Sequence, residues 1–285
     1  MNVSGVQKAF INGGRQLHLS HGPIELIIGV EGDADHISRA YTQAASRFDG
    51  LLEELVAELP KLRAHAEKNY SYSSPVSQRM AKAVSAMSRG FVTPMAAVAG
   101  AVADEILLCM RKNTELRRAY VNNGGDIALY VAPGQKFTAG VVADVTDPAI
   151  VAKVCVKSED AIGGIATSGW QGRSHSLGIA DAVTVLARDA SCADAAATLI
   201  ANAIDVPHSD KIHRQPANEL SPDSDLGTLP ITVFVGSLNA KERECALVGG
   251  EALARELCGK GLLKAAYLSL QGTVKTIDKP AMLAA

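Results

Sequence analysis

The 285-residue chain has few aromatic residues and no concentration of charge of one sign. Phe, Trp and Tyr make up 4% of it, the formal net charge is -2, and no block of five or more like charges occurs. A basic stripe is therefore absent, and we expect no nucleic-acid partner. The longest apolar stretch, residues 91–110, is broken by a proline, a glycine and two acidic residues, so we expect no membrane span either.

Two further absences bear on where the protein works. The N-terminus has no basic stretch followed by an apolar one, so a signal peptide is not expected. The five cysteines are odd in number and form no C-x-x-C motif. We favour the interpretation that they are small buried hydrophobic side chains in a reducing cytosol over a disulfide or a catalytic thiol. We therefore predict a cytoplasmic protein.

Hydrophobic residues make up 47% of the chain, which is enough for a sizeable core. Their spacing predicts antiparallel strands within residues 8–31, then an amphipathic helix that starts near Asp35 and is interrupted at Pro60. Further helices are expected at 78–90, 95–111, 189–203 and 240–257, and strands at 118–123, 127–132, 137–143, 151–157, 231–237 and 262–276. This order indicates an α+β fold with antiparallel sheets packed against helices.

We predict one domain over residues 1–285. Residues 205–229 are polar, contain three prolines and have no predicted element, so we interpret them as a candidate mobile lid. Asp223 and Asp225 in this run would suit calcium, but their spacing is not that of an EF-hand loop.

Asp194 and Thr198 are four residues apart on the helix expected at 189–203, for which Asp189 is the predicted N-cap, so their side chains share one face. A carboxylate and a hydroxyl there can supply two hard oxygen ligands of the kind that Mg²⁺ prefers. The same pair also fits an ordinary solvated helix face, which is the commoner case. The rest of the helix is mostly alanine, leucine and isoleucine, and a carboxylate on such an apolar helix needs a partner.

Other segments carry small polar residues that can face a ligand. Residues 163–169 end a strand with Gly, Thr and Ser, which lets backbone groups approach a ligand closely. His175 can exchange a proton near neutral pH, although a single histidine is more often structural. Arg173 can pair with a phosphate or lie on a surface strand. A further polar segment consists of Asn123, Gly124, Gly125 and Asp126, and an ordinary turn explains these residues without a ligand.

These segments together resemble motifs of the ApbE flavin-transferase superfamily. Residues 121–127 resemble its V-N-L-G-G-D-I segment, and residues 165–169 resemble its A-T-S-G segment. Ser174 and His175 resemble the S-H that opens its H-I-I-D-P motif.

The resemblance continues along the chain in the same order. Residues 182–186 are similar to the A-x-V-T-V segment, and residues 189–198 are similar to D-x-x-x-A-D-A-x-x-T. Residues 96–104 match the G-I-A-K-G-Y-A-V-D segment loosely, keeping Gly100 and Asp104.

The resemblance implies a T-fold-like ApbE-type architecture that binds FAD and Mg²⁺. It implies transfer of FMN to a threonine of a target flavoprotein, or hydrolysis of FAD. In such a site the metal is held by the Ala166 carbonyl, Asp194 and Thr198, and completed by water or phosphate. His175 is the catalytic candidate. The candidates for binding the ligand are Asn123, Gly124, Gly125, Asp126, Thr167, Ser168, Gly169 and Arg173.

The chain also departs from the family pattern. Ala99 stands where the family segment has lysine, and the D-P-R-T-G run after the histidine is replaced by residues 176–181. Neither the lipoprotein leader nor the N-terminal M-G-T segment has a counterpart in the sequence. These departures leave the metal ligands in place and alter the segments that would recognise the flavin.

Three hypotheses follow. The first is a Mg²⁺-dependent, FMN transferase-like or FAD/nucleotide hydrolase-like enzyme that acts on a flavin or related phosphorylated ligand, with or without a protein acceptor. The second is a protein that binds a flavin, pterin or nucleotide without catalysis. The third is a subunit of a larger enzyme, for which the many small apolar residues would form an oligomer interface, a homo-oligomer included.

Overall fold

Backbone contacts divide the protein into two units in the computed structural model, which describes residues 5–66, 70–87, 90–144, 147–172, 174–277 and 282–284. Unit 1 comprises residues 1–137, 156–166 and 187–194, and unit 2 comprises residues 138–155, 167–186 and 195–285. Helix α5 (Ala190–Asn202) begins in unit 1 and continues in unit 2. The expectation of one domain over the whole chain stays a prediction.

Unit 1 is built on an antiparallel sheet whose strands pair in the order β1 (Gln7–Ile11), β2 (Gln16–His21), β3 (Ile24–Gly32), β4 (Leu116–Asn123), β5 (Asp126–Val131) and β8 (Gly164–Ser168). Side chains alternate between a buried and a more exposed face, as Ala119, Tyr120 and Val121 do on β4. The buried face carries the core, which includes Leu26 and Ile28 of β3.

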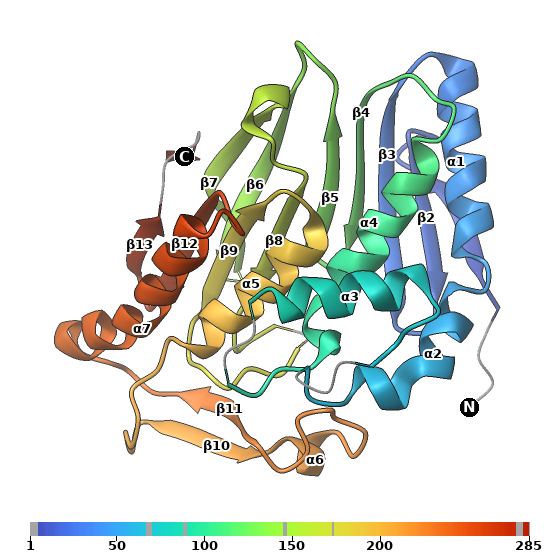
Figure 1. The fold of residues 1–285 in the computed structure, drawn as a ribbon. Helices are drawn as coiled ribbons and strands as arrows, with labels where there is room; N and C mark the ends of the chain where they lie inside the picture. Colours follow the sequence, from blue (N-terminus) through green and yellow to red (C-terminus); the bar gives the residue numbers. More distant parts are fainter. Residues whose placement is uncertain are drawn as a thin grey trace. The chain divides into compact units, whose positions relative to one another are not determined.

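The helices of unit 1 are α1 (Ala34–Phe48), α2 (Leu51–Leu62), α3 (Pro75–Ser85), the short 3-10 helix η1 (Pro94–Ala97) and α4 (Val98–Met110). Helix α4 packs against β4 and β5 as well as α1 and α3 (Figure 1). Ten of its thirteen residues are buried, which agrees with its almost wholly apolar sequence.

The predicted interruption at Pro60 is wrong. The chain breaks earlier, between α1 and α2, where Gly50 has a φ of 79°. Glycine adopts this left-handed conformation at little cost, so it ends one helical direction and starts another. Pro60 lies inside α2, two residues before that helix ends at Leu62, and therefore removes only one hydrogen bond near the end of the helix.

Most of the described part of unit 2 consists of short antiparallel sheets and helices. One sheet contains β6 (Lys136–Asp144), β7 (Asp147–Lys157) and β14 (Met282–Ala284), with β7 in the middle. In another, β12 (Ala265–Leu270) lies between β9 (Ala182–Ala187) and β13 (Thr273–Ile277). Helix α7 (Ala240–Gly259) packs against β12 and β13. The mixed fold with antiparallel sheets and helices is the one that the sequence predicts.

Two segments of unit 2 differ from expectation. Residues 262–276, predicted as one strand, form the β12–β13 hairpin, because Gln271 and Gly272 have φ values of 44° and 78° and make a tight turn. The polar run at 205–229 contains β10 (Ile212–Pro216) and the short helix α6 (Ala217–Leu220).

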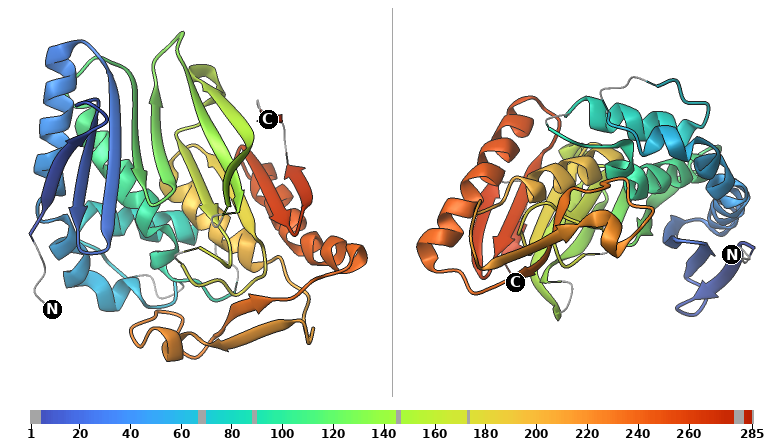
Figure 2. Two further views of the ribbon diagram at one scale, coloured as in Figure 1. Left: turned by 180° about the vertical axis from the view of Figure 1, so that it is seen from behind. Right: turned by 90° about the horizontal axis from the view of Figure 1, so that it is seen from below.

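Strand β10 pairs with β11 (Pro230–Val235), and Figure 2 shows this pair in orange. Backbone hydrogen bonds from Ala217 to Leu229 and from Asn218 to Gly227 close the loop between them. The run is therefore ordered, and its movement as a lid stays a prediction.

Within the described residues, no helix has the length and apolar character needed to cross a membrane. The burial expected for the cysteines holds for Cys109 and Cys192 but not for Cys245, which is exposed. Cys245 lies on helix α7, away from the buried residues Ala246 and Leu247 that follow it.

Candidate metal and ligand site

Helices α4 and α5 cap each other through two aspartate carboxylates, of which Asp104 is buried and Asp194 is half-buried. The Gly100 amide in the first turn of α4 donates a hydrogen bond of 2.9 Å to Oδ2 of Asp194 on α5. In return, Oδ1 and Oδ2 of Asp104 on α4 accept hydrogen bonds from the amides of Ala190 and Ser191, each at 2.9 Å. Because the first amides of a helix have no partner within the helix, each carboxylate satisfies donors that would otherwise be buried unpaired.

This exchange requires the two backbones to approach closely. A Cβ atom at Gly100 would lie 2.2 Å from the carbonyl oxygen of Ala190, and one at Gly164 would lie 2.2 Å from the carbonyl carbon of Asp189. Both positions therefore accept only glycine without a backbone shift. Asp189 also caps α5 locally, since its Oδ1 accepts the Cys192 amide at 2.8 Å, which confirms the predicted N-cap.

The two capping carboxylates are electrostatically unlike ordinary surface aspartates. Burial raises the pKa of Asp104 to about 6, although the amides of Ala190 and Ser191 act in the opposite direction. Burial also raises the pKa of Asp194 well above its usual range, and the nearby charge of Asp126 raises it further. The negative charge at Asp194 is thus poorly compensated by the surrounding side chains.

The predicted turn residues divide into a turn and a contact to α4. Gly124 and Gly125 have φ values of 64° and 116°, and the Gly125 amide donates to Oδ1 of Asn122 at 2.9 Å, as an ordinary tight turn requires. Asn123 is buried, and its Nδ2 donates to the Ala99 carbonyl at 3.1 Å. Of the predicted site residues, Asn123, Asp126 and Asp194 therefore come together at the start of α4.

Helix α5 is buried along nearly its whole length, and the exceptions are informative. From Ala190 to Ala201 every residue is buried except Asp194 and Thr198, which are half-buried. Their four-residue spacing places both on one face, as predicted. Among the described residues, no three His, Cys, Asp or Glu side chains gather into a metal-binding group. A metal ion at Asp194 would therefore depend on hydroxyl, carbonyl and water oxygens for its other ligands.

The A-T-S-G segment forms β8 and the turn after it. Ala166 is fully buried. Within unit 2, Oγ1 of Thr167 is 2.8 Å from Oγ1 of Thr184, and a Cβ at Gly169 would lie 2.2 Å from the Asp181 carbonyl oxygen. Thr167 is thus held by a neighbouring strand, and the backbone at Gly169 can pass closely because it has no side chain.

The predicted catalytic residue lies on the surface of unit 2. His175 is exposed. The next residue, Ser176, is buried and anchored: its hydroxyl lies 3.1 Å from Oδ1 of Asn202, and its carbonyl accepts the Thr232 amide at 2.9 Å. This anchor fixes the backbone beside His175 and leaves the imidazole accessible. Arg173, the predicted phosphate-binding residue, lies outside the described residues.

Sequence reasoning did not identify the part that the start of α4 plays. Ala99 and Gly100 supply the backbone groups that contact Asn123 and Asp194, and Asp104 holds the start of α5. The available signal was an aspartate and a glycine four residues apart inside an apolar helix, where both residue types are unfavourable. Such a pair indicates a close approach to another backbone.

Two curated relatives each match part of the chain. The UPF0280 protein of Methanothermobacter thermautotrophicus is 40% identical over 117 residues, which are 41% of this chain and 44% of that protein. The UPF0280 protein of Methanothrix thermoacetophila is 36% identical over 130 residues, which are 46% and 52%. The chain spans about half the length of the curated relatives it matches.

Among solved structures, the flavin transferase ApbE of Vibrio cholerae is similar at 13% identity and a TM-score of 0.47, over 92% of this chain and 96% of that chain. The family model described as AbpE bacteria matches residues 8–276, which is nearly the whole sequence. The predicted resemblance to ApbE proteins is therefore confirmed, and the chain belongs to the AbpE bacteria family.

Proposed function

We propose that the protein is a Mg²⁺-dependent enzyme that acts on FAD or a related phosphorylated ligand, either transferring FMN to a protein acceptor or hydrolysing the diphosphate. The observation that carries this proposal is the half-buried carboxylate of Asp194 at the start of α4, in a chain of the AbpE bacteria family. We further propose that it works in the cytoplasm and forms a homo-oligomer.

The residues around Asp194 fit a divalent cation. Burial and Asp126 both disfavour the ionised carboxylate, so a cation there would stabilise it. Thr198 supplies a hydroxyl on the same helix face, and the Ala166 carbonyl is the proposed third oxygen ligand. A site with one carboxylate suits Mg²⁺, which usually keeps several waters and binds through few carboxylates together with substrate phosphates.

When bound, the cation would neutralise charge that develops on a phosphoryl group. The protein's own groups would do the rest. Asn123 and Asp126 would orient the ligand at the start of α4, together with the turn glycines Gly124 and Gly125. In unit 2, Thr167, Ser168, Gly169 and Arg173 would bind its polar groups, and the exposed imidazole of His175 would carry the proton.

A second function, binding without transfer, is favoured by one specific observation. Ala99 occupies the position of the family lysine, and its amide belongs to the helix turn that faces Asp194. The chain thus lacks a side-chain cation at the position where the family segment carries one. In this case FAD would bind saturably with no turnover, and His175→Ala would leave the affinity unchanged.

Calorimetric titration of the full chain with MgCl₂, followed by chromatography of FAD incubations, tests both functions. We expect Mg²⁺ binding that weakens at least tenfold in Asp194→Asn and stays unchanged in Asp223→Asn, an exposed aspartate of the 205–229 run. Release of FMN or AMP that needs both Mg²⁺ and His175 would support the enzyme. Absence of Mg²⁺ binding and of turnover in a folded protein would refute the proposed enzyme.

A further inference from the structure

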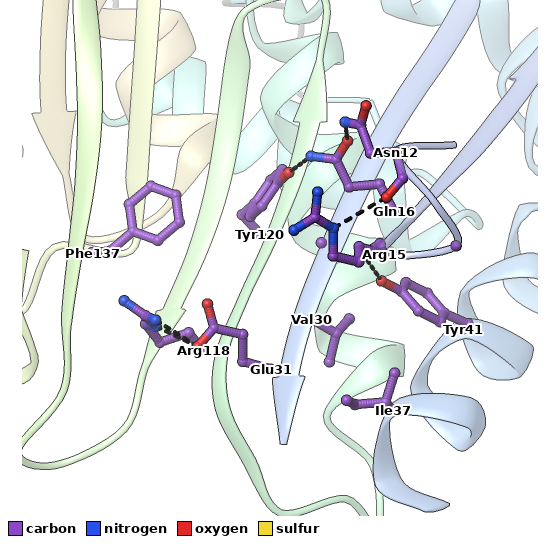
Figure 3. A pocket seen from close by; sticks show the side chains of 12 residues that line it. Asn12, Arg15, Gln16, Val30, Glu31, Ile37, Tyr41, Arg118, Tyr120 and Phe137 are labelled. Atoms are coloured by element: carbon purple, nitrogen blue, oxygen red, sulfur yellow. Dashed lines mark hydrogen bonds and ion pairs between the residues drawn. The ribbon is translucent and has the colours of Figure 1, made fainter. Parts of the chain in front are cut away.

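A cavity lies in unit 1, lined by residues other than those of the candidate metal and ligand site. It has a volume of about 450 Å³, within the range of small-molecule sites. Strand β2 begins at Gln16, which pairs with Gly29, whereas β3 continues to Gly32. The hairpin turn before β2 and the side chain of Tyr41 on α1 border the space beside this overhanging end of β3 (Figure 3).

The cavity surrounds the free end of β3, with Val30 and Tyr41 on the side of α1 and Arg118 and Tyr120 on the other side, and it does not include the contact at the start of α4. On β4, the buried residues Ala119, Val121 and Asn123 alternate with the more exposed Arg118 and Tyr120. Asn123 contacts α4, while Arg118 and Tyr120 line the cavity. A ligand in the cavity would therefore not touch Asp194, and the inference does not depend on the proposed function.

One wall of the cavity is aromatic and rigidly supported. The ring of Tyr120 lies directly on the backbone of Gly29. A Cβ atom on Gly29 would be only 2.3 Å from Cε1 of the ring. Phe137 packs edge-on against Tyr120, with ring centroids 5.7 Å apart at an interplanar angle of 61°. Aromatic rings held this way present a flat apolar surface at little cost in side-chain entropy, which suits a flat ligand ring.

The hydroxyl of Tyr120 is oriented by its neighbours. Nε2 of Gln16 donates a hydrogen bond to this hydroxyl oxygen, and Nδ2 of Asn12 donates to Oε1 of Gln16 (Figure 3). The hydroxyl oxygen of Tyr120 is therefore the acceptor at the end of this series of hydrogen bonds, and its own O–H remains able to donate. A ligand oxygen is a suitable acceptor.

Arg15 supplies a positive charge at the opening. It is exposed, and its Nε donates to the Asn12 carbonyl at 3.1 Å. The acidic residues at the end of β3 are paired elsewhere, Glu31 with Arg118 and Asp33 with Arg117. Within the described part of the chain no carboxylate forms an ion pair with Arg15, so its guanidinium can bind a carboxylate of a ligand in bidentate fashion.

We propose that this cavity binds a small aromatic carboxylate. The flat ring would lie against Tyr120 and Phe137, and the carboxylate would accept hydrogen bonds from the Arg15 guanidinium and the Tyr120 hydroxyl. Each group that the ligand needs is present on a different element, and Gly29 and Gln16 hold the tyrosine in place.

Calorimetric titration of the full chain in EDTA with 2-naphthoate tests the proposal, with 2-naphthamide and cyclohexanecarboxylate as matched probes. We expect saturable binding of 2-naphthoate and at least fivefold weaker binding of the neutral amide and of the non-aromatic acid. Arg15→Gln should weaken 2-naphthoate at least fivefold and leave 2-naphthamide unchanged. Arg255→Gln, which changes an exposed arginine on α7 in unit 2, should have no effect.

A second variant, Tyr120→Leu, keeps an apolar side chain and removes the flat ring and the hydroxyl, so it should weaken 2-naphthoate at least fivefold as well. Circular dichroism of each variant shows that it is folded. Absence of saturable 2-naphthoate binding at millimolar concentration would overturn the proposal. So would equal binding of the acid and the amide, or equal loss in Arg15→Gln and Arg255→Gln.

Discussion

The reciprocal capping of α4 and α5 makes Asp104 a measurable pH-dependent element of stability. Its carboxylate accepts two amides, those of Ala190 and Ser191, and is 8% exposed. The side chain introduced by Asp104→Asn has only one acceptor oxygen, because an NH₂ group, which is a donor, replaces the other oxygen. One buried backbone N–H thus loses its partner, which costs about 1–3 kcal/mol.

The same substitution removes an ionisation whose effect has a definite sign. Burial raises the pKa of Asp104 from 3.8 to about 6, so the folded state holds this proton more tightly than the unfolded state does. The contribution of this bound proton to the free energy of unfolding is fully present below about pH 4 and is lost as the pH rises through about 6. Since each pKa unit corresponds to about 1.4 kcal/mol, the loss is about 3 kcal/mol.

The side chain introduced by Asp104→Asn has no proton to lose, so the stability of wild type minus that of the variant should fall by about 3 kcal/mol between pH 4 and pH 7. Urea unfolding followed by far-ultraviolet circular dichroism, in EDTA, measures this difference at several pH values. Asp223→Asn, at an exposed position, should show a constant difference from wild type. Parallel pH profiles for wild type and Asp104→Asn would refute the conclusion that burial raises the pKa of Asp104.

Three other predictions concern packing and charge in unit 1. Gly100→Ala places a Cβ 2.2 Å from a backbone oxygen and should lower the melting temperature by several degrees, whereas Gly259→Ala, which meets nothing within 4 Å, should not. Asp189→Ala removes the local N-cap of α5 and should cost about 1 kcal/mol in urea unfolding. Arg47→Leu removes the 2.8 Å partner of the buried Glu105, which keeps only its 3.6 Å contact to Arg79, and should cost about 1–3 kcal/mol by the same measurement.

Local sequence patterns predicted most of the elements for identifiable reasons. The buried helix α4 follows from an almost continuous apolar run, and α5 from small residues after a capping aspartate. The errors arose where two local signals competed. The sequence predicts a break at Pro60, but Gly50 has the left-handed φ that redirects the chain. Gln271 and Gly272 form a turn inside a run with continuous strand character.

The site was only partly predictable, because its contacts join residues far apart in the sequence. Asp194 and Thr198 could be placed on one helix face from spacing alone. The partner of Asp194, however, is the Gly100 amide, 94 residues away, and no local pattern encodes that distance. The sequence likewise does not predict the cavity beside Arg15, because that cavity depends on β3 extending past the start of β2.

The two capping aspartates differ in one respect that decides which of them can bind a ligand. Asp104 holds one backbone amide on each oxygen and is almost wholly enclosed, so a hydrated cation has no open approach to this carboxylate. Asp194 is half-buried, and its Oδ2 accepts the Gly100 amide. Its raised pKa means that a proton or a cation must compensate its charge, and the two compete for the same carboxylate. Mg²⁺ binding should therefore strengthen as the pH rises and should release a proton, whereas Asp104 would contribute to binding only by holding α5 in position.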